Sequence, residues 1–95
     1  MRITFDRAKR DRTFADRGLA FEDAAEVLAG ETLEWPDDRR DYGEERIVTV
    51  GHLQGRMVIV IWTKRDGARH VISMRKANDR EQARYRERLA TGGRA

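Results

Sequence analysis

Residues 57–62 read Met57-Val58-Ile59-Val60-Ile61-Trp62, a continuously apolar and mostly β-branched run. Such a run is typical of a strand that is buried on both faces. It lies between Gln54-Gly55 and Asp66-Gly67, and an Asp-Gly pair between two apolar segments is a strong signal for a two-residue hairpin turn. Residues 46–53 and 68–74 are then the neighbouring strands. The stretch therefore predicts the middle of an antiparallel meander.

Two helices are expected before this meander. Apolar and polar residues alternate over residues 3–5, which suits a short edge strand, and Asp6 can cap a helix over residues 7–17 that ends at Gly18. From Phe21 onward, apolar residues recur at the i, i+3, i+4 and i+7 positions. This spacing predicts a second helix that ends near residue 30.

One more helix is expected after the meander. A polar loop that contains the single proline is predicted over residues 35–43, with a weakly supported strand over residues 32–35 before it. Asn78 and Glu81 match a capping box, with Asn78 as the N-cap, so a final helix should extend to about residue 90. Helices segregated from an antiparallel sheet indicate an α+β fold, with two N-terminal helices, a meander of three to four strands and a C-terminal helix.

Length and composition restrict the chain further. Its 95 residues suit a single domain, which we expect over residues 1–90, with a disordered tail at residues 91–95. The absence of cysteine excludes disulfides, thiol catalysis and cysteine-ligated zinc. No apolar run approaches the ~20 residues of a membrane span, and the N-terminus does not resemble a signal peptide. We therefore expect a cytoplasmic protein without membrane association.

Charge is unevenly distributed along the chain. Of the 20 basic residues, 17 are arginine, whose guanidinium group suits phosphate and carboxylate. Residues 20–46 carry ten acidic and three basic groups, whereas residues 64–95 carry ten basic and four acidic groups. The C-terminal third is thus basic enough to bind a polyanion, and the alternative is a solvated charged surface.

The candidate catalytic residues lie in this basic region. The chain has no metal-ligand pattern around its two histidines, no glycine-rich phosphate loop and no Gly-x-Ser-x-Gly turn, so we expect no metal and no cofactor. Cleavage of RNA without a metal needs groups that transfer protons and cations that stabilise the phosphorane. The catalytic candidates are Arg46, His70, Arg75 and Tyr85. The substrate-binding candidates are Lys9, Lys64, Arg69, Ser73, Arg80 and Arg84.

The strand pattern leaves structural alternatives open. On a regular strand Ser73 and Arg75 share one face, and His70 lies on the other unless the strand bends at its start. The alternatives to catalysis are a surface histidine for His70, an ion pair of Arg75 with Glu45 or Glu81, and a packing anchor for Tyr85.

Several short motifs follow one another in a defined order over residues 3–86. They are Phe5-Asp6 with Lys9, Gly18 with Phe21-Glu22-Asp23-Ala24, Gly43-Glu44-Glu45-Arg46 with Gly51, and Val71-Ile72-Ser73-Met74-Arg75-Lys76-Ala77 with Glu81 and Tyr85. In this order the chain resembles the BrnT toxins of bacterial type II toxin–antitoxin systems. The Ile-Ser-x-Arg-x-Ala segment followed by Glu and Tyr is the most specific part of the resemblance.

The resemblance implies a compact relative of the RelE-type ribonuclease fold that cleaves messenger RNA and inhibits translation. It also implies neutralisation by a BrnA-like antitoxin with a ribbon-helix-helix DNA-binding part, in a heterotetramer of two toxins and two antitoxins that represses its own operon. The family residues present here are Arg46, Ser73, Arg75, Glu81 and Tyr85. The short apolar stripe of the last helix, at Ala77, Tyr85 and Leu89, further suggests an apolar patch that the antitoxin would cover.

The chain departs from the family pattern in three places, one of which is Ala20, where a serine cap is common before Phe21. Family members usually have Asn-x-x-Lys-His-Gly before the second helix, whereas this chain has Thr13-Phe14-Ala15-Asp16-Arg17-Gly18. His70 stands where an arginine is usual. These departures keep an alternative function open, that of a catalytically weakened homologue that acts as a protein-binding module in operon autoregulation.

Overall fold

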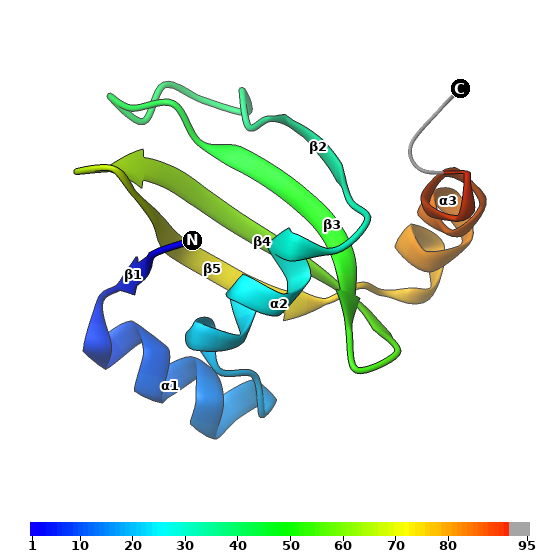
Figure 1. Cartoon of the computed structure of the whole chain (residues 1–95), viewed down its shortest axis with the longest axis horizontal. Helices are drawn as coiled ribbons and strands as arrows, with labels where there is room; N and C mark the ends of the chain where they lie inside the picture. The colour runs from blue at the N-terminus through cyan, green and yellow to red at the C-terminus, as the bar shows by residue number, and fades with distance from the viewer. Residues whose placement is uncertain (92–95) are drawn as a thin grey trace.

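The apolar run lies in the middle strand of a five-stranded sheet in the computed structural model, which describes residues 1–91 (Figure 1). The strands are β1 (Ile3–Phe5), β2 (Leu33–Pro36), β3 (Ile47–Leu53), β4 (Arg56–Arg65) and β5 (Ala68–Lys76). Their order across the sheet is β1-β5-β4-β3-β2. All neighbouring pairs are antiparallel except β1 and β5, which are parallel.

Both predicted hairpin turns are confirmed. Two residues join β3 to β4, and two join β4 to β5. Asp66 and Gly67 have φ values of 53° and 75°, and positive φ at both central residues defines the turn that matches the twist of paired strands.

The helices begin and end close to the predicted residues. They are α1 (Arg7–Arg17), the 3₁₀ turn η1 (Phe21–Asp23), α2 (Ala24–Ala29) and α3 (Asp79–Ala90). Asp6 accepts a hydrogen bond from the Lys9 N–H at 3.1 Å, and Gly18 ends α1 in the left-handed conformation. At the start of α3, both hydrogen bonds of the Asn78–Glu81 capping box are present.

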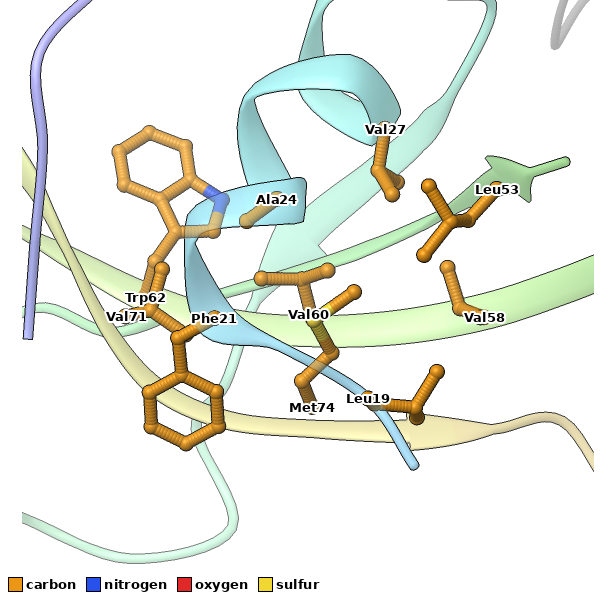
Figure 2. Packing of buried hydrophobic residues seen from close by; sticks show 10 residues of the cluster. All are labelled: Leu19, Phe21, Ala24, Val27, Leu53, Val58, Val60, Trp62, Val71 and Met74. Atoms are coloured by element: carbon orange, nitrogen blue, oxygen red, sulfur yellow. The ribbon is translucent and has the colours of Figure 1, made fainter. Parts of the chain in front are cut away.

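The sheet separates two apolar cores, which explains why β4 is apolar at successive positions. Val58, Val60 and Trp62 face the core under η1 and α2 (Figure 2). Met57 and Ile59 face the second core, which α3 covers. Because side chains alternate between the faces of a strand, a strand between two cores carries no polar face.

Three details correct the predicted fold. First, β1 joins the sheet in parallel with β5, so the sheet is mixed and has five strands instead of a meander of three to four. The ring of Phe5 packs edge-on against Phe21 at 6.0 Å, which holds β1 beside the first core. Second, the second helix begins with a 3₁₀ turn. Third, Pro36 ends β2 instead of lying in the loop, a position that an edge strand tolerates.

The expected apolar patch on the last helix is wrong, because Ala77, Tyr85 and Leu89 are all buried in the second core. Among residues 1–91, the large apolar side chains that remain exposed are Met1 and Phe14. No helix in this part of the chain is long and apolar enough to cross a membrane. The predicted disordered tail lies outside the described residues, apart from Thr91.

A pair of phenylalanines tests the first core. Phe21 is fully buried, whereas Phe14 is 50% exposed on α1. We expect Phe21→Ala to lower the free energy of unfolding by about 3–5 kcal/mol, through lost burial and a cavity. Phe14→Ala should lower it by less than about 1 kcal/mol. Urea unfolding followed by circular dichroism measures both, and equal losses would contradict this assignment of the core.

Candidate active site

A β-bulge interrupts the pairing of β5 with β4. Ser73 pairs with Ile61, but Val71 pairs with the next residue of β4, Trp62. Ile72 is therefore an extra residue that has no partner of its own on β4. Such a bulge changes which face of the sheet the following side chains occupy.

The bulge places His70 on the same face as Ser73 and Arg75. Val71 and Met74 both lie in the first core, so their neighbours at positions 70, 73 and 75 lie on the opposite face, where α3 packs. On a regular strand His70 would lie on the other face. The bend that the sequence left open is therefore present, and His70, Ser73 and Arg75 lie on one face of the sheet.

One group of polar residues lies at the end of this face that α3 does not cover. We call it the His70 cluster: Thr4, Glu44, Arg46, Arg65 and His70. The Nδ1 atom of His70 lies 2.9 Å from the Thr4 hydroxyl, and Glu44 accepts hydrogen bonds from Arg46 at 3.3 Å and Arg65 at 3.0 Å. Burial lowers the pKa of His70 below its usual value of 6.5, and the charge of Arg65 lowers it further. The imidazole is therefore mostly neutral at pH 7.

The loop before β3 positions Arg46. The Arg46 guanidinium stacks over the ring of Tyr42 at 4.0 Å, and Arg40 lies over the same ring at 5.0 Å. The Thr63 hydroxyl donates to the backbone carbonyl of Glu45 at 2.6 Å, which ties the end of this loop to β4.

The second group surrounds a cavity of about 180 Å³ between the sheet, α3 and the end of β2. We call it the Arg75 pocket: Trp35, Pro36, Asp37, Asp38, Arg39, Val48, Ile59, Ile61, Arg75, Glu81 and Tyr85. Arg75 donates two hydrogen bonds to Glu81, at 2.7 and 2.8 Å, and Glu81 also accepts the Asn78 N–H. The bonds from Arg75 are the largest cause that lowers the pKa of Glu81, to about 2. The Tyr85 ring packs 5.5 Å from that of Trp35.

A second ion pair lies at the rim of the Arg75 pocket. Asp37 accepts hydrogen bonds from Arg39 at 2.7 and 2.8 Å. The Asp37 side chain is 1% exposed and that of Arg39 is 69% exposed. The hydrogen bond from Arg39 lowers the pKa of Asp37, so this carboxylate stays charged although it is buried.

The structure divides the four predicted catalytic residues into two pairs. His70 pairs across the strands with Thr63, and Arg75 with Ile59, four residues away on β4. At ~3.3 Å per residue their backbone positions are about 13 Å apart, and the Arg75 guanidinium is directed at Glu81 on α3 instead of toward His70. Arg46 belongs with His70, and Tyr85 belongs with Arg75.

The predicted substrate-binding residues are more widely spread. Ser73 and Lys9 line a groove of about 350 Å³ between α1 and the edge of β5. Arg84 lies over the Tyr85 ring at 5.9 Å, and Arg80 is exposed at the start of α3. Lys64 is exposed near the end of β4, whereas Arg69 stacks over Trp62 at 4.8 Å.

Sequence reasoning missed several residues of both groups. Trp35 and Arg39 were not assigned to the site, because they lie far along the chain from the basic strand. Arg65 belongs to the basic cluster that the sequence shows, but it was not among the candidate site residues. The Arg39-Arg40 pair inside an acidic segment was the one available signal. Within residues 1–91, no group of three or more His, Asp or Glu residues is placed to hold a metal ion.

Comparison with known families identifies a matching family. The model described as the ribonuclease toxin, BrnT, of type II toxin–antitoxin systems matches residues 5–81. The matched range includes Glu44, Arg46, His70, Arg75 and Glu81. No curated protein matches the chain.

Acid should weaken the fold through Glu81. Its pKa falls from 4.5 to about 2, so the stabilisation is present above pH 4.5 and is lost as the pH falls toward 2. Glu81→Gln lacks this charge, and its free energy of unfolding should therefore decline less between pH 5 and pH 2. Glu87→Gln, an exposed position on the same helix, is the matched control and should decline as the wild type does. Identical slopes for all three proteins in chemical denaturation would refute the assignment.

Proposed function

The chain belongs to the BrnT family of ribonuclease toxins of type II toxin–antitoxin systems, and on that premise we propose that it cleaves messenger RNA without a metal ion and inhibits translation. One observation carries the proposal. A largely neutral imidazole, His70, lies near the Arg65 guanidinium and the Glu44 carboxylate, which also holds Arg46, on a sheet face that α3 leaves open.

His70 is the proposed general base. With a proton on Nδ1 directed at Thr4, its Nε2 atom is free to accept the proton of a ribose 2′-hydroxyl. The 2′-oxygen attacks phosphorus, the bond to the 5′-oxygen breaks, and that oxygen takes a proton from water. The products are a 2′,3′-cyclic phosphate and a 5′-hydroxyl. Arg46 and Arg65 stabilise the negative charge of the phosphorane.

Arg75 holds a nearby nucleotide of the same RNA strand. Its backbone position lies about 13 Å from that of His70 on the same face, a distance that follows from four residues of β4. Arg80 and Arg84 on α3 extend the positive surface beyond it, and Lys9 supports the RNA backbone toward the other end. Lys64 and Arg69 pair on the opposite side of the sheet, where Arg69 stacks over Trp62, so the proposed RNA surface does not include them. Tyr85, packed against Trp35, contributes to this binding part.

A toxin of a type II system has an antitoxin partner. We propose that the partner is a BrnA-like protein with a ribbon-helix-helix part, and that two copies of each chain form a heterotetramer. The acidic side chains of η1 and α2, Glu22, Asp23 and Glu26, lie on the side of the sheet opposite His70 and repel RNA, which leaves that side available to a protein partner. The rest of the acidic segment, up to Glu45, adjoins the proposed RNA site.

A second candidate function is a catalytically weakened homologue that acts as a protein-binding module in operon autoregulation. The observation that favours it is the pairing of each site arginine with a carboxylate. Glu44 holds Arg46 and Arg65, and Glu81 holds Arg75. Each carboxylate partly neutralises the positive charge that its arginine would present to a phosphate. Cleavage assays separate the two candidates.

Two histidines test the cleavage. We expect His70→Gln to lower the rate on a long RNA by about 100-fold or more, because it removes the general base. His52→Gln, an exposed position on β3, should leave the rate unchanged. A chelator should have no effect on the wild type.

The pH profile of the same assay tests the role of His70. Arg65 and Lys9 lower its pKa, Glu44 and Asp6 raise it, and burial is the largest influence, so the net pKa lies below 6.5. Since the neutral form is the base, the rate should rise with pH and reach its half-maximum below pH 6.5. A rate that requires a divalent ion, or the absence of cleavage by the pure protein, would reject the proposal in favour of another mechanism or of the second candidate.

Arg75→Ala tests RNA binding. Loss of one phosphate contact should weaken binding to single-stranded RNA about tenfold and reduce the slope of log affinity against log salt by about 0.7. Growth inhibition in cells should disappear, and the thermal transition should remain cooperative. Lys76→Ala, the exposed neighbour on β5, is the control. An unchanged salt slope in Arg75→Ala would show that Arg75 contacts no phosphate.

A further inference from the structure

We propose that Thr4 is a positioning residue, whose hydroxyl holds the proton of the His70 imidazole on Nδ1 and so keeps the Nε2 lone pair available to RNA. This inference rests on the function proposed above, in which the proton must lie on Nδ1. Three features carry it: the register of β1, the contacts of the two ring nitrogens and the charges around the ring. Thr4 lies outside the range that the family model matches, residues 5–81.

The packing of β1 determines where the Thr4 side chain points. Ile3 and Phe5 pack against the first core, so Thr4, between them, faces the opposite side of the sheet. The parallel register pairs Thr4 with His70 across the two strands. The Thr4 hydroxyl therefore lies 2.9 Å from Nδ1 of a residue that is 66 positions away in the sequence.

The two ring nitrogens of His70 have different surroundings. Nδ1 has the Thr4 hydroxyl as its partner, whereas Nε2 has no hydrogen-bond partner among residues 1–91. No buried side-chain nitrogen or oxygen in this part of the chain lacks a partner, so Nε2 must reach the surface. It is therefore the nitrogen that a ribose hydroxyl can approach.

The charges around the ring favour a proton on Nδ1. Because β5 lies between β1 and β4, the side of the ring away from Thr4 is the side of β4, which carries Arg65. Arg65 lowers the pKa of His70 more than Glu44 raises it. Lys9 likewise outweighs Asp6, so the net field at the ring is positive. A positive field favours a lone pair over an N–H on the nitrogen that faces it.

A threonine hydroxyl can hold this arrangement. It has two acceptor lone pairs and one donor, so it can accept from Nδ1 while its own hydrogen turns to water. The hydrogen bond that one ring nitrogen makes sets which nitrogen of a neutral imidazole carries the proton. Without such a bond, an imidazole in water carries its proton mostly on Nε2, where it blocks the base. Loss of the Thr4 hydroxyl should therefore move the proton from Nδ1 to Nε2.

Three variants separate the hydroxyl from the strand that carries it. Thr4→Val removes the hydroxyl and keeps a β-branched side chain, whereas Thr4→Ser keeps the hydroxyl. Ile3→Val changes the neighbouring residue of β1, which faces the first core, and leaves Thr4 in place. All three should unfold in a cooperative thermal transition.

The position of the proton can be measured directly. Long-range ¹H–¹⁵N spectra of the full-length ¹⁵N-labelled protein distinguish a protonated from an unprotonated ring nitrogen, at about pH 7.5, where His70 is neutral. His70→Gln assigns the signals. The wild type, Thr4→Ser and Ile3→Val should carry the proton on Nδ1, and Thr4→Val should carry it mostly on Nε2. His52, exposed on β3, should be the same in all four proteins.

The cleavage assay gives a second measurement. In Thr4→Val only a minor fraction of His70 can accept a proton, so kcat on a long RNA should fall about tenfold while KM stays unchanged. Thr4→Ser and Ile3→Val should cleave within about twofold of the wild-type rate.

A proton on Nε2 in the wild type, or on Nδ1 in Thr4→Val, would overturn the inference. So would Thr4→Ser that behaves as Thr4→Val does while its thermal transition matches that of the wild type. The spectra need no cleavage, so the expected tautomers in an inactive protein would refute only the proposed function. Full cleavage by Thr4→Val, with none by His70→Gln, would refute only this inference.

Discussion

Burial of β4 on both of its faces is the constraint on which the rest of the molecule depends. Val58 and Val60 require cover on one side, and Met57 and Ile59 require it on the other. The chain supplies η1 and α2 for the first face and α3 for the second. Since α3 is short, it covers the half of its face near the β3–β4 hairpin and leaves the other half open. The polar residues of the His70 cluster therefore lie on the half of this face that α3 leaves open (Figure 1).

Local signals made much of the fold predictable. The Asp66-Gly67 turn, the Asp6 cap and the Asn78–Glu81 capping box each depend on residues a few positions apart, and all three are confirmed. The parallel pairing of β1 with β5 joins residues more than 60 positions apart, and no local pattern announces it. The same holds for the site. Arginines and a histidine were recognisable as candidates, but their division into two groups depends on strand register, and Trp35 joins one group through tertiary packing alone.

Ion pairs fix the arginines of both the His70 cluster and the Arg75 pocket, and Glu81 makes two kinds of contact. Its carboxylate completes the capping box of α3 and also fixes Arg75 with two hydrogen bonds. The first turn of the helix and the guanidinium are therefore coupled, so that the helix cannot fray at its start without releasing the arginine. Glu44 plays a comparable part for Arg46 and Arg65 at the other end of the face. The ion pairs hold the arginines in fixed positions, which would reduce the entropy lost if RNA binds there as proposed.

The bulge at Ile72 has a consequence for the evolution of such chains. Substitutions along β5 leave each side chain on its own face of the sheet. The gain or loss of one residue between His70 and Ser73 instead moves the side chains before the change to the opposite face relative to those after it. A homologue that loses the extra residue keeps its hairpin turns and helix caps, but its histidine points to the face that η1 and α2 cover, away from Arg75. When homologous chains are aligned, a one-residue gap in this strand therefore marks a change in chemistry, even where every neighbouring letter is identical.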